Sequence, residues 1–471
     1  MLFNSFHFLI FFVVVTFLYY ALPFKWRWFL LLLASCYFYA VLIPVYLFVL
    51  FGIIIIDYCA GIFIERSSGK KRKLFLAASI IANIGVLVVF KYHNFFVENI
   101  NDLLSHLNIH AKPFPLWHLL LPVGLSFHTF QAMSYTIEVY RGNQKPEKHF
   151  GIYALYVMFY PQLVAGPIER PQNLLHQFYE KHRPDYSMIS SGLKTMLLGF
   201  FMKVVVADRL SIYVDYVYTD VNVHSRMALI VASIFYSFQI YCDFAGYSLI
   251  AIGAARVMGV KLSENFQQPY LSSSITDFWR RWHKTLSGWF RDYLYIPLGG
   301  NKVSQLRYCF NILVVFILSG LWHGANWTFI TWGLLHGIFI ILESLINKNR
   351  KRKTRFTVTA YIYSFTIITF SWILFRSVNL SEAFTFIKRI VSLEVPWQIA
   401  GEFNERALLL YSCFGIACVI LADIKNEFYS DRHFFLYHKN SLVRMAASVV
   451  LMIIIMMLGV FDGGQFIYFQ F

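Results

Sequence analysis

Charged residues are scarce in this chain of 471 residues: only 14% are Asp, Glu, Lys or Arg, whereas 58% are hydrophobic. A soluble globular domain is typically about one quarter charged. The mean hydropathy of +0.56 points the same way. The composition therefore indicates an integral membrane protein, and the aromatic content of 19% supplies bulky helix faces and interfacial belts.

Several motifs are also missing, and each absence removes a class of chemistry. The six cysteines include no C-x-x-C pair, which argues against a disulfide framework or a zinc site. There is no G-x-S-x-G nucleophile elbow, no P-loop and no G-x-G-x-x-G. We therefore expect no metal and no tightly bound cofactor. The first 26 residues lack a basic start and an A-x-A site, so they are interpreted as a retained first span.

The net charge of +16 comes from basic residues in short loops between apolar runs. Such loops are retained in the cytoplasm and contact anionic headgroups, so membrane lipids are expected as partners and nucleic acid is not. The densest basic loops, 65–73 and 347–355, are predicted to be cytoplasmic. This orientation places both termini outside the cell and residues 141–188, 258–305 and 425–441 inside it.

Apolar runs near the length of a bilayer predict an all-α, polytopic membrane protein with about 11–12 transmembrane helices. No internal repeat and no long polar region is present, so residues 1–471 are expected to form a single membrane-embedded domain. Two mixed stretches, near 151–180 and 263–305, are interpreted as re-entrant or interfacial. The spans are expected near residues 6–22, 28–43, 45–64, 74–90, 117–140, 189–206, 228–257, 306–321, 325–346, 357–375, 406–424 and 442–461.

Asp243 lies inside an otherwise apolar run, four residues after Gln239. A carboxylate at that depth costs about 3 kcal/mol unless it is paired, protonated or hydrated. Two interpretations stay open: a structural carboxylate tied to a cation or to backbone amides, which is favoured, or a residue that lines a polar substrate cavity.

The run 272–301 is too charged to span a membrane and too aromatic for a free loop. It fits an interfacial or re-entrant amphipathic segment. Its basic side chains suit the phosphate groups of a ligand, although a solvated interfacial helix explains them equally well. The candidate substrate-binding residues here are Trp279, Arg280, Arg281, Trp282 and Lys284, and His283 is a candidate catalytic residue.

The apolar run 318–337 carries His323 and His336. A lone histidine in such a helix is usually a hydrogen-bonded core residue. His323 is nevertheless flanked by Trp322 and lies between two glycines, and imidazole titrates near neutral pH, which suits proton removal from a hydroxyl. His336 is expected to be structural, because on one continuous helix it would face away from His323 unless Gly324 or Gly333 bends the chain. Trp322 and Asn326 complete the candidate substrate-binding set.

The chain resembles the membrane-bound O-acyltransferases, in particular the bacterial branch with the alginate O-acetyltransferase membrane subunit and the teichoic acid D-alanyl-transfer protein. The resemblance covers essentially the whole length. Its motifs are "PQLVAGPIERP" (161–171), "QIYCDFAGYS" (239–248), "DFWRRWHKTLSGWFRDYLYIPLGGN" (277–301), "GLWHGANWTFITWGLLHG" (320–337) and the tail "FIYFQF" (466–471).

The resemblance implies tilted helices in a ring around a funnel, in the bacterial cytoplasmic (inner) membrane. It also implies family histidines at the positions of His323 and His283. An acyl group, by default acetyl, is expected to arrive from the cytoplasm as a thioester, on coenzyme A or a carrier protein. The acceptor is then a hydroxyl of an extracytoplasmic polysaccharide or partner protein, as in exopolysaccharide or alginate O-acetylation.

Two other functions remain open at this point. The first is a transporter or flippase, which often shows inverted repeats that this sequence lacks. The second is a scaffold for a polysaccharide-modifying complex, in which the histidines are structural. Only an acyltransferase needs His323 for turnover.

Overall fold

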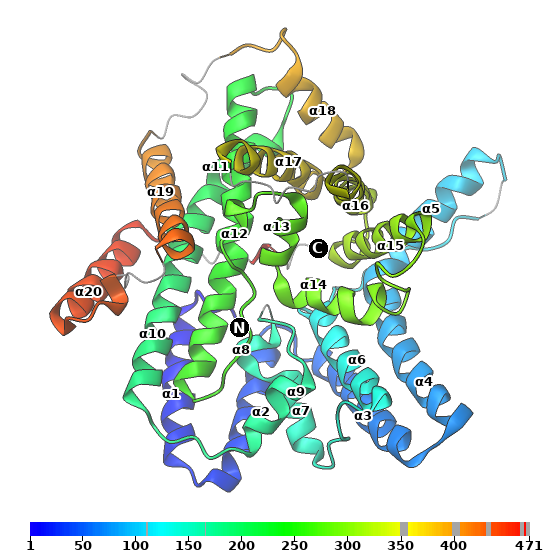
Figure 1. The fold of residues 1–471 in the computed structure, drawn as a ribbon, viewed down its shortest axis with the longest axis vertical. Coiled ribbons are helices and arrows are strands. Elements are labelled where there is room, and N and C mark those ends of the chain that lie inside the picture. Colours follow the sequence, from blue (N-terminus) through cyan, green and yellow to red (C-terminus); the bar gives the residue numbers. More distant parts are fainter. Residues whose placement is uncertain are drawn as a thin grey trace. The chain divides into compact units, whose positions relative to one another are not determined.

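A computed structural model describes residues 1–109, 112–164, 166–348, 357–397, 406–429, 435–461 and 466–467. Within these ranges all regular secondary structure is helical, as the sequence predicts (Figure 1). Most of the basic loop expected at 347–355, and the tail beyond Ile467, lie outside the described residues.

The chain divides into two compact units. The first unit comprises Met1–Leu193 and Ala251–Ser263, and the second comprises Lys194–Ile250 and Glu264–Phe471. Two helices, α10 (Tyr186–Phe200) and α12 (Arg226–Val257), have residues in both units. The other helices of the first unit are α1 (Phe6–Ala21), α2 (Phe24–Ala40), α3 (Tyr46–Arg66), α4 (Gly69–Leu87), α5 (His93–His106), α6 (Leu125–Arg141), α7 (Phe150–Met158), α8 (Tyr160–Leu163) and α9 (Pro171–Leu174).

The second unit contains the longest series of apolar helices, and short helical turns connect some of them. Its helices are α11 (Asp208–Thr219), α13 (Ile275–Arg281), α14 (Lys284–Phe290), α15 (Gln305–His323), α16 (Trp327–Lys348), α17 (Val358–Arg376), α18 (Leu380–Val391), α19 (Arg406–Phe428) and α20 (Ser441–Leu458). π-Helical turns occupy Val88–Tyr92, Phe201–Ala207 and Arg291–Tyr295, and 3₁₀ turns occupy Leu175–Tyr179, Pro269–Leu271 and Phe435–Tyr437.

The expected spans all coincide with helices, but their lengths differ from the prediction. Among the described residues, eight helices are long and apolar enough to cross a membrane, fewer than the 11–12 expected, and α1 is apolar but shorter. The helix expected from residue 117 begins only at Leu125. The span expected at 74–90 belongs to a continuous helical stretch, Gly69–His106. Both mixed stretches contain short helices in place of a span.

Helices α15 and α16 pack side by side, and glycines allow their backbones to approach closely (Figure 1). A Cβ atom on Gly320 would lie 2.2 Å from the carbonyl oxygen of Phe329. A Cβ atom on Gly333 would lie 2.2 Å from that of Phe316. Small residues at such contacts are typical of membrane helix pairs. Of the two possibilities that a glycine offers, close approach of backbone or of a ligand, Gly320 therefore serves the first.

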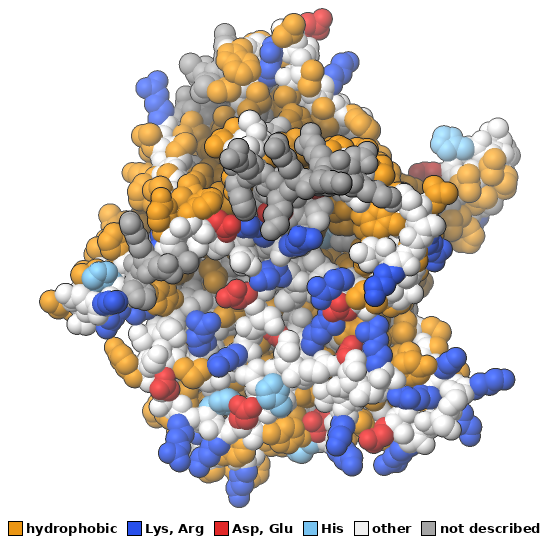
Figure 2. Space-filling view, in the orientation of Figure 1, with side chains coloured by type: hydrophobic (Ala, Val, Ile, Leu, Met, Phe, Trp, Pro, Cys, Tyr) orange, Lys and Arg blue, Asp and Glu red, His pale blue; other side chains and the backbone are white. Residues whose placement is uncertain are grey.

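Apolar side chains cover the outer surface of several spanning helices of the second unit. Leu410 and Leu421 of α19 are 70% and 66% exposed, and Figure 2 shows hydrophobic side chains gathered over this helix. A helix with an exposed apolar surface is stable in a bilayer, where lipid tails replace water.

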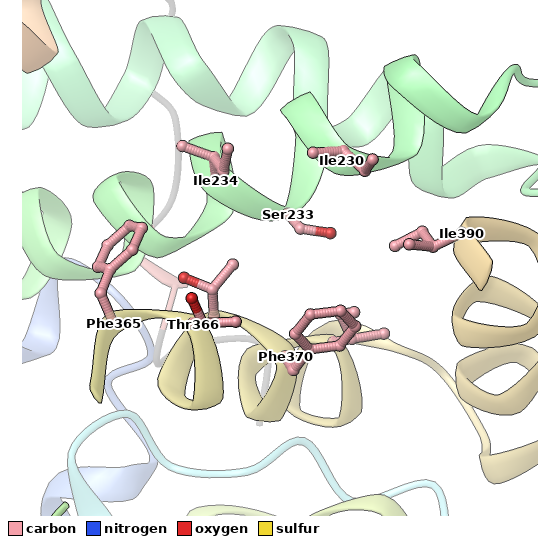
Figure 3. Close-up of a pocket in the computed structure, with 9 residues that line it drawn as sticks. Ile230, Ser233, Ile234, Phe365, Thr366, Phe370 and Ile390 are labelled. Carbon is pink, nitrogen blue, oxygen red and sulfur yellow. The ribbon is translucent and has the colours of Figure 1, made fainter. Parts of the chain in front are cut away.

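A cavity of about 210 Å³ lies between α12, α17 and α18 of the second unit (Figure 3). It is lined mainly by apolar side chains, which include Ile234, Phe370 and Ile390. The residues that α17 contributes lie on the face opposite Ser371 and Phe375, since positions three to four apart share a helical face. The cavity is therefore separated by α17 from the histidines described below.

Candidate functional site

His323 is the last residue of α15, and its side chain is enclosed by aromatic rings. The residue is only 2% exposed. The rings of Trp322, Trp332 and Phe375 meet its imidazole edge-on, with centroids at 5.0, 5.3 and 5.3 Å respectively. An enclosure of this kind excludes water from the imidazole.

Trp322 contacts both candidate catalytic histidines. Its ring centroid lies 5.0 Å from that of His323 and 6.1 Å from that of His283. His283 belongs to the segment between α13 and α14, whereas Trp322 and His323 end α15. The fold therefore brings the two histidines, forty positions apart in the sequence, to the same indole ring.

His283 is fully buried and lies in the left-handed backbone region, with φ of 43°. A residue with a Cβ atom adopts this conformation only at a cost of about 1–2 kcal/mol. Its Nδ1 atom is 3.0 Å from Oδ1 of Asn265. His283 lies outside the spanning helices, and burial lowers its pKa to about 3, so the imidazole is neutral at physiological pH. Strained backbone of this kind is concentrated at functional sites.

His336 is held by two hydrogen bonds inside the second unit. The indole Nε1–H of Trp279 donates to His336 Nδ1 over 3.2 Å. Ser371 donates its hydroxyl to the carbonyl of Ile368, so it accepts the hydrogen of His336 Nε2, 3.0 Å away. Both ring nitrogens therefore have protein partners, as expected for a structural histidine.

The two hydrogen bonds agree with the structural role expected for His336, and the chain leaves the helix at Gly324, one of the two glycines at which the sequence prediction allowed a bend. His323 and His336 do not share one helix, because α15 ends at His323 and α16 begins at Trp327. Trp332 lies between the two histidines, with ring centroids at 5.3 Å from His323 and 4.9 Å from His336.

Four tryptophans of the second unit form one buried cluster next to these histidines. Trp332 and Trp372 are stacked, with centroids 5.6 Å apart and planes at 21°. Trp279 contacts Trp332 at 5.6 Å, and Trp282 contacts Trp372 at 5.1 Å. The predicted substrate-binding residues Trp279 and Trp282 thus lie inside the cluster. Trp332 of α16 and Trp372 and Phe375 of α17 were not predicted from the sequence, because nothing local in either helix indicates that these rings lie near His323.

Glu343 of α16 fixes the start of α13. Its carboxylate accepts hydrogen bonds from the backbone N–H groups of Ile275 and Thr276, at 2.6 and 3.0 Å, and from the hydroxyl of Thr276. An anion at a helix N-terminus satisfies donors that the helix itself leaves unpaired. This contact positions the aromatic residues of α13. The residues around Glu343 in the sequence give no indication of this role.

The three basic candidates of this segment differ in their surroundings. Arg281 forms a bidentate pair with Glu427, at 2.8 and 3.0 Å, and a further bond to Asp277. Lys284 donates to Gln267 over 3.2 Å. Arg280 is exposed. The guanidinium group of Arg281 is therefore occupied by carboxylates of α13 and α19. Of the three, Arg280 is the basic side chain that is best placed to contact a soluble ligand.

Asp243 is buried in an ion-paired cluster. Lys203 lies 2.7 Å from a carboxylate oxygen of Asp243 and 2.7 Å from one of Asp208. The other oxygen of Asp243 accepts the backbone N–H of Ile467 over 2.7 Å. These contacts match the structural interpretation of Asp243, with a lysine as the cation. Lys203 was not predicted as the partner of Asp243, because the two residues are forty positions apart in the sequence.

Asn326 lies at the start of α16, and the backbone engages both ends of its side chain. Its Nδ2 donates to the carbonyl of Val378 over 2.8 Å, and its Oδ1 accepts the N–H of Thr328 over 3.0 Å. This pattern is that of a helix-capping residue.

In the first unit, the motif at 161–171 is held by Glu169, which the sequence analysis did not single out. Its carboxylate accepts the backbone N–H and the hydroxyl of Ser263. Glu169 is 1% exposed, and burial raises its pKa. This contact ties the motif to the residues that follow α12.

Residues 149–385 match the membrane-bound O-acyltransferase family. The chain belongs to this family and is an O-acyltransferase. It is 36% identical to the probable alginate O-acetylase AlgI of Pseudomonas aeruginosa, over 92% of this chain and 82% of the relative. It is 35% identical to the peptidoglycan O-acetyltransferase of Helicobacter pylori, over 94% and 91%. It is 27% identical to the teichoic acid D-alanyltransferase of Bacillus subtilis, over 59% and 74%.

Proposed function

We propose that this enzyme moves an acetyl group from a cytoplasmic thioester to a hydroxyl of an extracytoplasmic polysaccharide or partner protein, with His323 as the general base. The thioester is acetyl-CoA or an acetylated carrier protein, and the enzyme lies in the bacterial cytoplasmic membrane. The observation that carries the proposal is the contact of His283 and His323 with the same ring, that of Trp322. The names of the relatives support acetyl as the group and a cell-surface glycan as the acceptor.

The chemistry needs one base and one oxyanion donor. A ring nitrogen of His323 takes the proton of the acceptor hydroxyl as that oxygen attacks the thioester carbonyl. The tetrahedral intermediate collapses with cleavage of the C–S bond, and the imidazolium returns the proton to the departing thiolate. The products are an ester and a free thiol, so no proton is gained or lost overall.

Trp332 is the residue best suited to stabilise the oxyanion. It is fully buried, and its indole N–H has no hydrogen-bond acceptor in the described part of the chain. Leaving a buried donor unpaired costs about 1–3 kcal/mol. A donor kept at this cost beside His323 fits a site in which negative charge develops on a substrate oxygen.

The aromatic enclosure has a role in the same proposal. A thioester that waits near a base is open to hydrolysis, and exclusion of water prevents this side reaction. Because His323 is 2% exposed, the two substrates must displace aromatic rings to reach it. The enclosure therefore opens only when substrate groups replace those rings.

Acyl transfer by a His323→Ala variant tests the proposal. Membranes that contain the full chain receive acetyl-CoA or an acetylated carrier protein with a radiolabelled acetyl group, and label in extracytoplasmic glycan is counted. His323→Ala should lose turnover. His336→Ala removes a histidine whose two ring nitrogens are bonded to protein groups, so the molecules of this variant that fold should retain turnover. Retained turnover in His323→Ala would refute the general base. Label that never leaves the donor in wild-type membranes would refute the donor assignment.

A further inference from the structure

Asn265 makes a set of hydrogen bonds that fixes the orientation of its side-chain amide. Its Oδ1 atom lies 3.3 Å from the backbone nitrogen of Thr285 and 2.9 Å from the Thr285 hydroxyl. A backbone N–H can only donate. The atom of Asn265 that faces Thr285 must therefore be the oxygen, and the amide cannot be reversed.

The same oxygen lies 3.0 Å from Nδ1 of His283. An amide oxygen accepts hydrogen bonds and never donates them, so Nδ1 must carry the hydrogen. His283 is neutral at physiological pH because burial lowers its pKa to about 3. A neutral imidazole carries a single ring hydrogen. Nε2 therefore holds the lone pair and is a hydrogen-bond acceptor.

The backbone on both sides of His283 is bound to the segment that contains Asn265. The N–H of Lys284 donates to the carbonyl of Asn265 over 2.9 Å, and the N–H of Gln267 donates to the carbonyl of Arg281 over 3.0 Å. These bonds hold His283 in its left-handed conformation, which its own side chain disfavours. The backbone of residues 265–267 thus fixes the backbone conformation of His283, and the side chain of Asn265 binds its imidazole ring.

We infer that Asn265 is a positioning residue that fixes His283 in the Nδ1–H tautomer, so that Nε2 accepts a hydrogen bond from the attacking hydroxyl. This inference rests on the proposed function for the identity of that hydroxyl. It also divides the roles at the site. A histidine with its lone pair at Nε2 orients a donor and does not stabilise an oxyanion, which leaves the oxyanion to the indole N–H of Trp332.

The tautomer is measured without any substrate, which separates this inference from the proposed function. The full chain, labelled with ¹⁵N in its histidine rings, is studied by NMR in lipid bilayers. The chain has 15 histidines, so the His283 signals are identified by subtracting the spectrum of His283→Asn. We expect a protonated Nδ1 and an unprotonated Nε2. A protonated Nε2 in the wild-type protein would overturn the inference, whatever the activity.

Two variants separate tautomer control from general packing. Asn265→Leu removes the acceptor at similar size, whereas Thr285→Val removes one donor to the same oxygen and leaves the bond to His283. Asn265→Leu should shift His283 toward the Nε2–H tautomer and lower kcat roughly 10- to 100-fold, as for other partners that orient a functional histidine, with little change in the donor KM. Thr285→Val should change neither the tautomer nor kcat. An unchanged tautomer in folded Asn265→Leu, or an equal loss of kcat in both variants, would contradict the assignment.

Discussion

The indole ring of Trp332 meets the imidazole of His323 edge-on, with centroids 5.3 Å apart and planes at 89°. Trp332 comes from α16, nine residues beyond His323, across the break between α15 and α16. The ring of Trp332 thus contacts both His336, which is hydrogen-bonded to protein groups, and His323, which is enclosed by aromatic rings. This arrangement makes Trp332 the most informative position to alter.

Trp332→Phe should lower kcat by about 10²–10³-fold, because it removes one oxyanion donor from a site without water. Stability should change little, since the variant also removes a buried N–H that the protein leaves unpaired. The measurements are single-turnover acyl transfer and thermal unfolding in detergent. Trp279→Phe is the matched control: it deletes an indole N–H that is bonded to His336, so it should lose stability and keep most of its turnover per folded molecule. A Trp332→Phe enzyme with wild-type kcat would remove Trp332 from the mechanism.

His336→Leu should destabilise the second unit by about 1–3 kcal/mol, because the Trp279 N–H would remain buried without an acceptor. Thermal unfolding of the purified protein gives the change. In the double variant His336→Leu, Trp279→Phe the loss should be smaller than the sum of the single losses, since each change removes the same bond. Strict additivity would mean that the hydrogen bond between these residues does not form in the membrane.

Lys203→Met should destabilise the protein by about 3–5 kcal/mol, because two buried carboxylates would lose their shared cation. Thermal unfolding in detergent measures this loss. Adding Asp243→Asn should restore part of the stability by removing one of the unpaired charges. A partly exposed pair supplies the comparison: Arg376 and Asp215 are 2.7 Å apart with side chains 23% and 57% exposed, and their separation should cost less than the loss of Lys203. Similar losses at the two pairs would argue that Lys203 is hydrated.

The sequence predicted helix positions well, because an apolar run near bilayer length is a local property that needs no knowledge of the partner. His283 and His323 were also proposed as site residues from local features, as polar groups within strongly aromatic or apolar runs. Residues that act through distant contacts were missed. Asn265, Glu343 and Lys203 are ordinary polar residues in the sequence, and their importance appears only when folding brings His283, α13 and Asp243 beside them.

The break between α15 and α16 was predicted, because separate spans were expected at residues 306–321 and 325–346, and the two helices end at His323 and begin at Trp327. Only the comparison of His323 with His336 considered one continuous helix. The chain leaves the helix at Gly324, whose backbone is extended, with φ of −160° and ψ of 147°. Asn326 then caps the next helix. Both signals were present in the sequence as a glycine and a capping residue.

His283 allows a test of its backbone conformation together with its chemistry. Asn tolerates the left-handed region and Leu does not, so His283→Asn should be more stable than His283→Leu by about 1–2 kcal/mol. His283→Asn should also retain more turnover, because its amide oxygen is still an acceptor. The control is the same pair of substitutions at His336, which lies within helix α16. There, the Asn variant should not be more stable than the Leu variant. Equal stability of the two His283 variants would mean that residue 283 leaves the left-handed region in the bilayer.

Arg280 and Arg281 are neighbours in sequence with different surroundings, so reversing their charges should give different results. Arg280 is exposed, so Arg280→Glu should leave stability unchanged. The hypothesis that Arg280 contacts the phosphate groups of the donor predicts a higher donor KM in this variant, by about tenfold for the loss of 1.4 kcal/mol of binding. Arg281→Glu should instead destabilise the protein, because it breaks the bidentate pair with Glu427 and places two carboxylates together.

The measurements for this pair are initial rates of acetyl transfer against acetyl-CoA concentration, and thermal unfolding of each variant. Arg281→Glu combined with Glu427→Arg restores the ion pair in reverse and should recover much of the lost stability, which confirms that the loss was electrostatic. A donor that carries no phosphate group, such as an acetylated short thiol, should show the same KM with Arg280→Glu as with the wild type. An unchanged acetyl-CoA KM in Arg280→Glu would place donor recognition elsewhere on the enzyme.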